Sequence, residues 1–323
     1  MMKTGIIGGA GYTAGELLRL LVNHPHIDIA FVHSNSQAGK PVHHVHQDLA
    51  GDIALAFTNQ LFLDEVDLIF LCMGHGQSQL FLEKNAPLPP QLKVIDLSHD
   101  FRLKRPGHSF VYGLPELNKS SIQGSQYIAN PGCFATAIQL ALLPLAAQQV
   151  LNNEVHVHAI TGSTGAGQAP GATTHFSWRN NNVSVYKAFQ HQHLGEIGQS
   201  IQQLQTGFER AINFIPVRGN FSRGIMASVY TECDWTTEEA TQYYQDYYHD
   251  HPFVLVSDTN PDLKQVVNTN KALLYVEKHD NKLLIISMID NLLKGASGQA
   301  VQNMNLIFGW DETTALKLKS IGF

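Results

Sequence analysis

The stretch TGIIGGAGYTAGE, residues 4–16, decides the fold of this chain. An apolar strand, Thr4–Gly8, breaks into the glycine-rich turn Gly8–Gly15, and a leucine-rich helical segment begins at Glu16. This order is typical of a dinucleotide-binding unit, because glycine lets the backbone approach a pyrophosphate and the helix N-terminus attracts its charge. The stretch predicts that Gly8 and Gly11 bind a dinucleotide; a plain tight turn is the alternative.

Apolar runs of strand length recur through the first third of the chain. They lie at residues 27–32, 67–72 and 93–97, and helical segments separate them. Strands that alternate with helices predict a parallel sheet built of βαβ units. The 323 residues also exceed what one hydrophobic core usually serves, so we expect two domains. The predicted fold is α/β, with an N-terminal Rossmann-like dinucleotide-binding domain.

The pattern changes at about residue 155. Residues 155–160 alternate with period two, and the runs at 224–231 and 283–289 are long and strand-like, which favours a largely open sheet. We therefore expect a second domain of the α+β class. The stretch 296–308 has apolar positions at helical spacing and is expected to return to the first domain. The predicted boundaries are residues 1–132 with a C-terminal helix at about 294–323, and residues 133–293.

Composition excludes several classes of partner. The chain is 44% hydrophobic and 15% charged, carries a net charge of −6, and has no Lys/Arg block, so we expect neither nucleic acid nor an anionic membrane as partner. The first residues are short in apolar length, which argues against a signal peptide, and no apolar run reaches a membrane span. Three scattered cysteines indicate a reducing compartment. We expect a cytoplasmic protein.

A cysteine follows a Pro-Gly pair in the stretch ANPGCFAT, residues 129–136. Cys133 stands directly before a long apolar, helix-like run, and the first turn of a helix favours a thiolate through its N–H groups and dipole. We predict that Cys133 is a nucleophile. The alternative is a buried core thiol, which is the interpretation that we favour for Cys72 and Cys233.

Two histidines and a glutamate form a second candidate group. His191 and His193 are followed by Glu196, which gives an imidazole and a carboxylate the proximity that a general acid/base needs. The pair is also compatible with a metal ion, but no third ligand cluster of recognisable spacing accompanies it. We expect acid/base chemistry at His191 or His193 and no metal.

Two glycine-rich polar stretches are candidates for lining a site. They are residues 161–167 and 220–224. The first offers backbone N–H groups that can hold an oxyanion. A mobile loop between two elements is the alternative.

The segment after the second predicted strand bears on the choice of cofactor. NAD-specific domains often carry an acidic residue there, and residues 33–40 contain none. Ser34, Ser36 and Lys40 can instead accept a 2′-phosphate, so NADP is favoured over NAD. A polar surface loop is the alternative.

Together these residues resemble the N-acetyl-γ-glutamyl-phosphate reductases, the arginine-pathway branch of the acyl-phosphate reductases that also include aspartate-semialdehyde dehydrogenases. The resemblance runs nearly end to end. The motifs that carry it are the Gly-Tyr-Thr turn within residues 8–16, DLSHDFRL at 96–103, YGLPE at 112–116, NPGC at 130–133, residues 161–167, His-Gln-His with Glu-Ile at 191–197, SRGI at 222–225 and DNLLKGA at 290–296.

The resemblance implies a role for each motif residue. Cys133 matches the nucleophile, and the acid/base belongs to the histidine pair, with a slight preference for His191. Arg102 and Arg223 match positions suited to clamp the phosphate and carboxylate of a substrate, because a guanidinium fork fits both groups. The remaining implied ligands are Glu196 for the substrate, and Tyr12, Thr13 and Asn291 for the cofactor.

The implied activity is the NADPH-dependent reduction of N-acetyl-γ-glutamyl phosphate to the semialdehyde and phosphate through a Cys133 thioester. The second domain would then be catalytic and dimerising, in a homodimer or homotetramer. An N-succinyl-glutamyl or aspartyl phosphate is an alternative substrate, and a nucleotide-sensing regulatory protein is an alternative of another class. Asn35 stands where the family often has arginine, which weakens the NADP preference.

Overall fold

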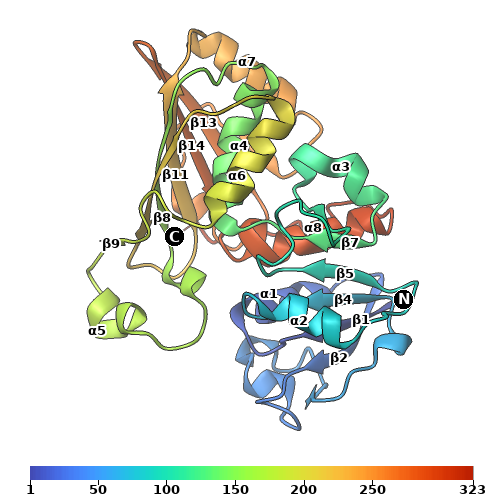
Figure 1. Ribbon diagram of the computed structural model, residues 1–323. Helices are drawn as coiled ribbons and strands as arrows, with labels where there is room; N and C mark the ends of the chain where they lie inside the picture. Colours follow the sequence, from blue (N-terminus) through green and yellow to red (C-terminus); the bar gives the residue numbers. More distant parts are fainter. Residues whose placement is uncertain (323) are drawn as a thin grey trace. The chain divides into compact units, whose positions relative to one another are not determined.

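The computed structural model describes residues 1–322 and divides the chain into two compact units (Figure 1). The first unit consists of Met1–Pro131 and Ala296–Lys317, and the second of Gly132–Gly295 and the residues from Leu318 on. Residue 323, the last of the C-terminal range predicted above, lies outside the described residues.

The first unit is built on a seven-stranded sheet in the order β3-β2-β1-β4-β5-β7-β6, and all its strand pairs are parallel. All four residues of β4 are buried, as in a parallel sheet that is covered on both faces. The strands are β1 (Met2–Ile7), β2 (Ile27–His33), β3 (Phe57–Thr58), β4 (Leu68–Leu71), β5 (Lys93–Asp96), β6 (Val111–Tyr112) and β7 (Tyr127–Ala129).

The helices of the first unit include one from the far end of the sequence. Helix α8 packs against α1 and α3, and all its residues are buried (Figure 1). Some of its polar side chains bind neighbouring segments, since Asn303 Nδ2 donates to the Gly113 carbonyl at 2.8 Å and Asn305 Oδ1 lies 2.9 Å from His24 Nε2. The helices are α1 (Tyr12–Leu21), α2 (Gln77–Lys84), α3 (Pro115–Gln123) and α8 (Gly298–Ile307).

The second unit carries a mixed seven-stranded sheet in the order β12-β13-β14-β11-β8-β10-β9. Its centre is antiparallel, whereas β10 pairs with β8 and β12 with β13 in parallel. The strands are β8 (Val155–Thr161), β9 (Ser184–Val185), β10 (Ile212–Arg218), β11 (Ile225–Glu232), β12 (Val254–Val256), β13 (Ala272–His279) and β14 (Lys282–Ile289).

Helices α4, α6 and α7 lie along one side of this sheet (Figure 1). Helix α4 is buried from Phe134 to Ala146 and forms the centre of the second core. Two tyrosines of α7 fasten it, because the hydroxyls of Tyr244 and Tyr248 donate to the Ala141 and Leu140 carbonyls. The helices of this unit are α4 (Cys133–Ala147), α5 (Phe176–Arg179), α6 (His193–Leu204) and α7 (Thr237–Tyr248).

Short helical turns connect these elements. Six are 3₁₀ turns within the described residues: η1 (Val42–His44), η2 (Gln47–Leu49), η3 (Leu63–Glu65), η4 (Ser163–Ala166), η5 (Ala172–Thr174) and η6 (Leu263–Gln265). The seventh, η7 (Leu293–Ser297), is a π-helical turn that leads into α8.

The structure confirms the predicted fold class, an α/β unit with a parallel sheet followed by an α+β unit. The predicted strand ranges differ from the observed ones by one or two residues. The run predicted to begin at residue 224 is β11, which begins at Ile225, because Gly224 adopts φ +110° and cannot belong to a strand. The helical stretch predicted from residue 296 becomes α8 only at Gly298, after the π-helical turn.

Candidate active site

The thiol of Cys133 lies on the first residue of α4. Gly132 is the N-cap and is extended, with φ −73° and ψ 149°, and its carbonyl accepts the Thr136 N–H at 2.8 Å. The first turn of α4 contains no acidic residue. The dipole and the N–H groups of the helix terminus therefore stabilise a thiolate, and no carboxylate in the same turn repels its charge.

The other two thiols lie in environments that keep them protonated. Burial raises the pKa of Cys72 to about 12, although the Thr13 side chain partly opposes this shift. Burial likewise raises the pKa of Cys233. Cys133 shares the intermediate exposure of Cys72, but unlike Cys72 and Cys233 it is the first residue of a helix, and this position distinguishes its environment from theirs.

Gly295 lies directly against Cys133. A Cβ built on Gly295 would stand 2.8 Å from Cys133 Cβ and 3.2 Å from the Asp290 carbonyl oxygen. Any side chain at residue 295 would therefore displace Cys133 or the turn that follows β14, so this position requires glycine. The DNLLKGA motif contains this glycine, but the sequence alone gave it no role, because the contact joins segments 162 residues apart.

His191 is buried beside the start of α4. Its ring packs edge-on against Phe134, with centroids 5.5 Å apart, and lies 4.5 Å from the His193 ring. Nδ1 accepts the His193 backbone N–H at 3.2 Å, so a neutral ring carries its proton on Nε2. Burial, with a smaller contribution from the Lys187 charge, lowers the pKa of His191 to about 4. His191 is therefore neutral at pH 7 and presents an N–H donor.

Glu196 joins the histidine pair to the start of α4. Its buried carboxylate accepts the Gly132 N–H through Oε2 at 2.9 Å, and Oε1 lies 3.9 Å from His193 Nε2. His193 and Glu196 both lie in the first turn of α6, where a negative charge is favourable. The structure thus brings together Cys133, His191, His193 and Glu196, as expected from the sequence.

Tyr186 and Arg218 also belong to this group, and the sequence did not reveal them. Burial, and next the charge of Cys133, raise the pKa of Tyr186 to about 12, so the phenol stays protonated. The Arg218 guanidinium carbon lies 4.6 Å from the centre of the Tyr186 ring. Tyr186 directly follows the two-residue edge strand β9, and Arg218 is the last residue of β10. The sequence holds little signal for either residue, because only the pairing of β9 with β10 brings the two together.

The glycine-rich stretch 161–167 is anchored by hydrogen bonds within the second unit. The backbone N–H groups of Gly162, Ser163 and Thr164 donate to the carbonyls of Gly224, Phe221 and Ser222 at 2.8–3.2 Å. The N–H groups of Gly165 and Gly167 close the 3₁₀ turn itself. Five N–H groups of this stretch thus already bind carbonyls, and the expectation that it supplies oxyanion donors stays a prediction.

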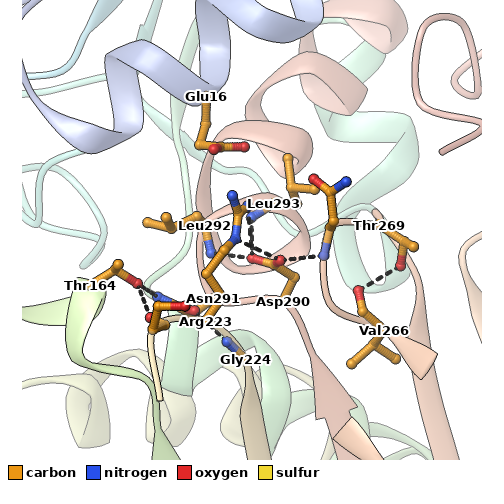
Figure 2. Close-up of polar contacts among 12 residues, drawn as sticks. Glu16, Thr164, Arg223, Gly224, Val266, Thr269, Asp290, Asn291, Leu292 and Leu293 are labelled. Atoms are coloured by element: carbon orange, nitrogen blue, oxygen red, sulfur yellow. Dashed lines mark hydrogen bonds and ion pairs between the residues drawn. The ribbon is translucent and has the colours of Figure 1, made fainter. Parts of the chain in front are cut away.

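The dipeptide Asp290–Asn291 binds the second polar stretch (Figure 2). Arg223 Nε lies 3.0 Å from Asp290 Oδ2, and the Gly224 N–H donates to Asn291 Oδ1 at 2.7 Å. Asn291 Nδ2 donates to Thr164 Oγ1 at 3.0 Å. Asn291, predicted as a cofactor ligand, and Arg223, predicted as a substrate ligand, therefore share one hydrogen-bonded network.

The first unit contains the predicted cofactor turn. Gly8 adopts φ +79°, and a Cβ there would stand 2.7 Å from the Cys72 carbonyl oxygen. Gly11 is the N-cap of α1, and a Cβ there would meet nothing within 4 Å. Tyr12 and Thr13 are the first residues of α1. The open space beside Gly11 lies at the N-terminus of α1 and can accommodate a pyrophosphate. The N–H groups and the dipole of the helix stabilise the negative charge of such a group.

The predicted 2′-phosphate ligands all lie in the segment after β2. The Ser34 and Ser36 hydroxyls are 3.5 Å apart, and Lys40 Nζ donates to Gln37 Oε1 at 3.0 Å. They lie beyond the carboxyl end of a strand of the parallel sheet, where such folds bind ligands.

Arg102 is buried in the first unit. Its Nε donates to the Asn130 carbonyl at 2.9 Å and its Nη2 to the Leu97 carbonyl at 3.0 Å. Arg102 therefore binds the residues that directly follow β5 and β7, and the second of these, Asn130, begins the NPGC motif. Its predicted role as a substrate ligand stays a prediction.

The described residues contain neither a metal cluster nor a membrane-spanning helix. Among residues 1–322, no cluster of three or more His, Cys, Asp or Glu side chains is arranged to hold a metal ion. In the same part of the chain, no helix combines the length and the apolar character that crossing a bilayer requires.

Two family models match the chain, one in each half. Residues 3–125 match the NAD binding domain of semialdehyde dehydrogenases, and residues 133–291 match the dimerisation domain of the same family. The matches together cover most of the sequence.

Curated relatives are similar over the full length. Proteins named N-acetyl-gamma-glutamyl-phosphate reductase from Parabacteroides distasonis and Bacteroides thetaiotaomicron are 59% and 57% identical, each over 100% of both chains. A solved structure, aspartate semialdehyde dehydrogenase II of Vibrio cholerae complexed with ASA, has a TM-score of 0.75 at 17% identity and covers 96% of this chain and 98% of its own. That structural likeness concerns the fold.

The two glycines of the cofactor turn should respond differently to alanine. We expect Gly8→Ala to lower the free energy of unfolding by about 1–3 kcal/mol, since the new Cβ meets a backbone carbonyl at positive φ. Gly11→Ala should cost less stability, because the space around it is open, but should weaken dinucleotide binding. Denaturant unfolding and cofactor titration measure both effects, and equal losses of stability would contradict the geometry.

The buried His191 should make stability depend on pH. Its pKa is about 4 in the folded chain, against 6.5 for an unperturbed histidine, so the unfolded chain binds its proton first as pH falls. The free energy of unfolding should therefore decrease between about pH 6.5 and 4, and His191→Gln should show a shallower decrease. The exposed His249→Gln serves as control. Identical slopes in the wild type and His191→Gln would refute the assignment.

Proposed function

Because the chain belongs to the N-acetyl-gamma-glutamyl-phosphate reductases of the semialdehyde dehydrogenase family, we propose that it reduces N-acetyl-γ-glutamyl phosphate to N-acetylglutamate semialdehyde with release of phosphate, in arginine biosynthesis. The observation that carries this proposal is the thiol of Cys133 at the first turn of α4, next to the His193–Glu196 pair. These are the groups that covalent reduction of an acyl phosphate requires.

Cys133 acts as the nucleophile. Its thiolate attacks the acyl carbon, the new C–S bond forms, and the bond from that carbon to the phosphate oxygen breaks, so that phosphate leaves with the bonding electrons. NADPH, when bound, supplies the hydride that reduces the thioester carbonyl. The resulting thiohemiacetal loses the C–S bond, which gives the aldehyde and restores the thiolate.

We assign the proton transfers to His193 in preference to His191, which the motif alone favoured slightly. The low pKa of His191 makes it a neutral N–H donor rather than an acid near pH 7. His193 has the Glu196 carboxylate 3.9 Å from Nε2, which is the orienting partner of a general acid/base. Charge on the carbonyl oxygen is stabilised by the Tyr186 hydroxyl and by N–H groups at the start of α4.

We propose NADP as the cofactor within the NAD-binding domain. Gly8, Gly11, Tyr12 and Thr13 would hold its pyrophosphate, and the cluster of Ser34, Ser36 and Lys40 would accept the 2′-phosphate. Asn291 is the further cofactor ligand that the motif implies. Arg102 and Arg223 are assigned to the substrate. Glu196, which the motif implies as a substrate ligand, is instead assigned to positioning His193 and the start of α4.

The assembly and location follow from the family and the thiols. The match to a dimerisation domain supports a homo-oligomer, which we take to be a homodimer or homotetramer. None of the three cysteines, all within the described residues, forms a disulfide, which suits the reducing conditions of the cytoplasm.

The reaction is tested in the phosphorylating direction. The purified protein should reduce NADP when N-acetylglutamate semialdehyde and inorganic phosphate are both present, and it should act more slowly with NAD. Aspartate semialdehyde and N-succinylglutamate semialdehyde are run in parallel. Faster NADP reduction with one of these two compounds would be consistent with the same mechanism on a different substrate. No NADP reduction with any of the three compounds, in a protein that binds NADP, would support a nucleotide-sensing regulator.

The covalent step predicts the behaviour of one variant. Cys133→Ser should bind NADP normally but lose on the order of 10³-fold or more in kcat, because serine at this position lacks the acidity of a thiol. Cys233→Ser, at a buried structural cysteine, is the matched control and should keep its activity. Turnover by Cys133→Ser at the wild-type rate would rule out the thioester.

A further inference from the structure

The carboxylate of Asp290, which follows β14, is completely buried and accepts hydrogen bonds from three segments (Figure 2). Arg223 donates through Nε to Oδ2 at 3.0 Å and through Nη2 to Oδ1 at 3.3 Å. The backbone N–H groups of Asn268, Leu292 and Leu293 donate at 2.6, 2.8 and 3.2 Å. The mechanism above gives this carboxylate no task.

Such a set of contacts fixes the direction of the guanidinium group. A buried carboxylate is costly unless it is paired and hydrogen-bonded, so the five donors and Asp290 hold one another in place. Two contacts along the Nε–Nη2 edge determine the plane of the Arg223 fork, which one contact would leave free to rotate. The direction in which Arg223 points is therefore set by Asp290.

The backbone around Arg223 is held by the next residue of the same dipeptide. Asn291 Oδ1 accepts the N–H of Gly224 at 2.7 Å. Gly224 itself has φ +110°, and a Cβ there would stand 2.7 Å from Leu263 Cδ1. Both the side chain and the flanking peptide of Arg223 are thus anchored on Asp290–Asn291.

The same turn reaches the nucleophile. The Gly295 N–H donates to the Asp290 carbonyl at 2.9 Å, and Gly295 packs against Cys133 Cβ. Displacement of Asp290 would therefore affect Arg223 and the wall beside Cys133 together.

We propose that Asp290 is a positioning residue that aims Arg223 at an anionic group of the substrate and holds the turn that backs Cys133. The inference rests on the proposed function and deepens it. The anion is either the transferred phosphate or the carboxylate of the semialdehyde, and separate KM values for the two compounds distinguish these sources.

The experiment is a double-mutant cycle on the full-length protein. The variants are Asp290→Asn, Arg223→Gln, the double variant and, as control, Asp258→Asn at an exposed position. Each is assayed for kcat and for the KM of N-acetylglutamate semialdehyde and of phosphate, and its unfolding midpoint is recorded. Asp290→Glu, which keeps the charge but shifts it by one methylene, serves if Asp290→Asn does not fold.

We expect Asp290→Asn to raise the KM of one of the two anions by about 10-fold, as for loss of a charge-assisted contact, and Arg223→Gln to raise the same KM. The double variant should raise that KM no further than Arg223→Gln does, because Asp290 acts on it through Arg223. If Asp290→Glu has to be used, it should raise the same KM by a smaller factor. Asp258→Asn should match the wild type.

Three results would overturn the inference. They are unchanged KM values in the Asp290 variants, additive increases in the double variant, or a loss confined to the unfolding midpoint. If the wild type lacks phosphate-dependent NADP reduction, the proposed function fails and this inference fails with it. A wild type that is active beside Asp290 variants with normal KM values would refute the positioning role alone.

Discussion

The hydrogen bond from the Gly132 N–H to the Glu196 carboxylate is the interaction on which the site depends. It joins the first turn of α6, which carries His193, to the N-cap of α4, which presents Cys133. The carboxylate is buried, so this hydrogen bond replaces the contacts that water would make with it. Its second oxygen faces His193. One side chain thereby ties the start of α6 to the start of α4. In the mechanism proposed above, the helix terminus makes the thiol of Cys133 reactive, and the same carboxylate, 3.9 Å from Nε2, orients the His193 imidazole.

Asp290 is the second buried carboxylate that organises this unit. Glu196 accepts the Gly132 N–H, and Asp290 accepts those of Asn268, Leu292 and Leu293. Each also faces a side chain assigned to the chemistry, His193 for Glu196 and Arg223 for Asp290. In this account the carboxylates position, whereas thiol, imidazole and guanidinium groups react or bind. Such over-determined contacts allow a site to hold its geometry within the tolerance that catalysis needs.

Local patterns predicted much of the fold and part of the site. The glycine turn, the alternation of strands and helices, and the start of α4 at Cys133 follow from spacing within a few residues, and all were found. The remaining features depend on long-range contacts. Glu196 meets Gly132 across 64 residues, and the N–H groups of residues 162–164 are taken by carbonyls of residues 221–224. The burial that makes His191 neutral likewise arises only in the folded unit, so the motif alone could not separate it from His193.

The central claim is that the acyl group passes through Cys133, and the most direct measurement is the mass of the protein during turnover. Incubation with N-acetylglutamate semialdehyde and NADP without phosphate should let the thioester accumulate, since nothing then removes it except water. We expect the intact protein to gain the mass of one N-acetylglutamyl group, and peptide mapping to find it on the peptide that contains Cys133. Rapid NADP reduction on adding phosphate, without any adduct before it, or an adduct on another residue, would contradict the account.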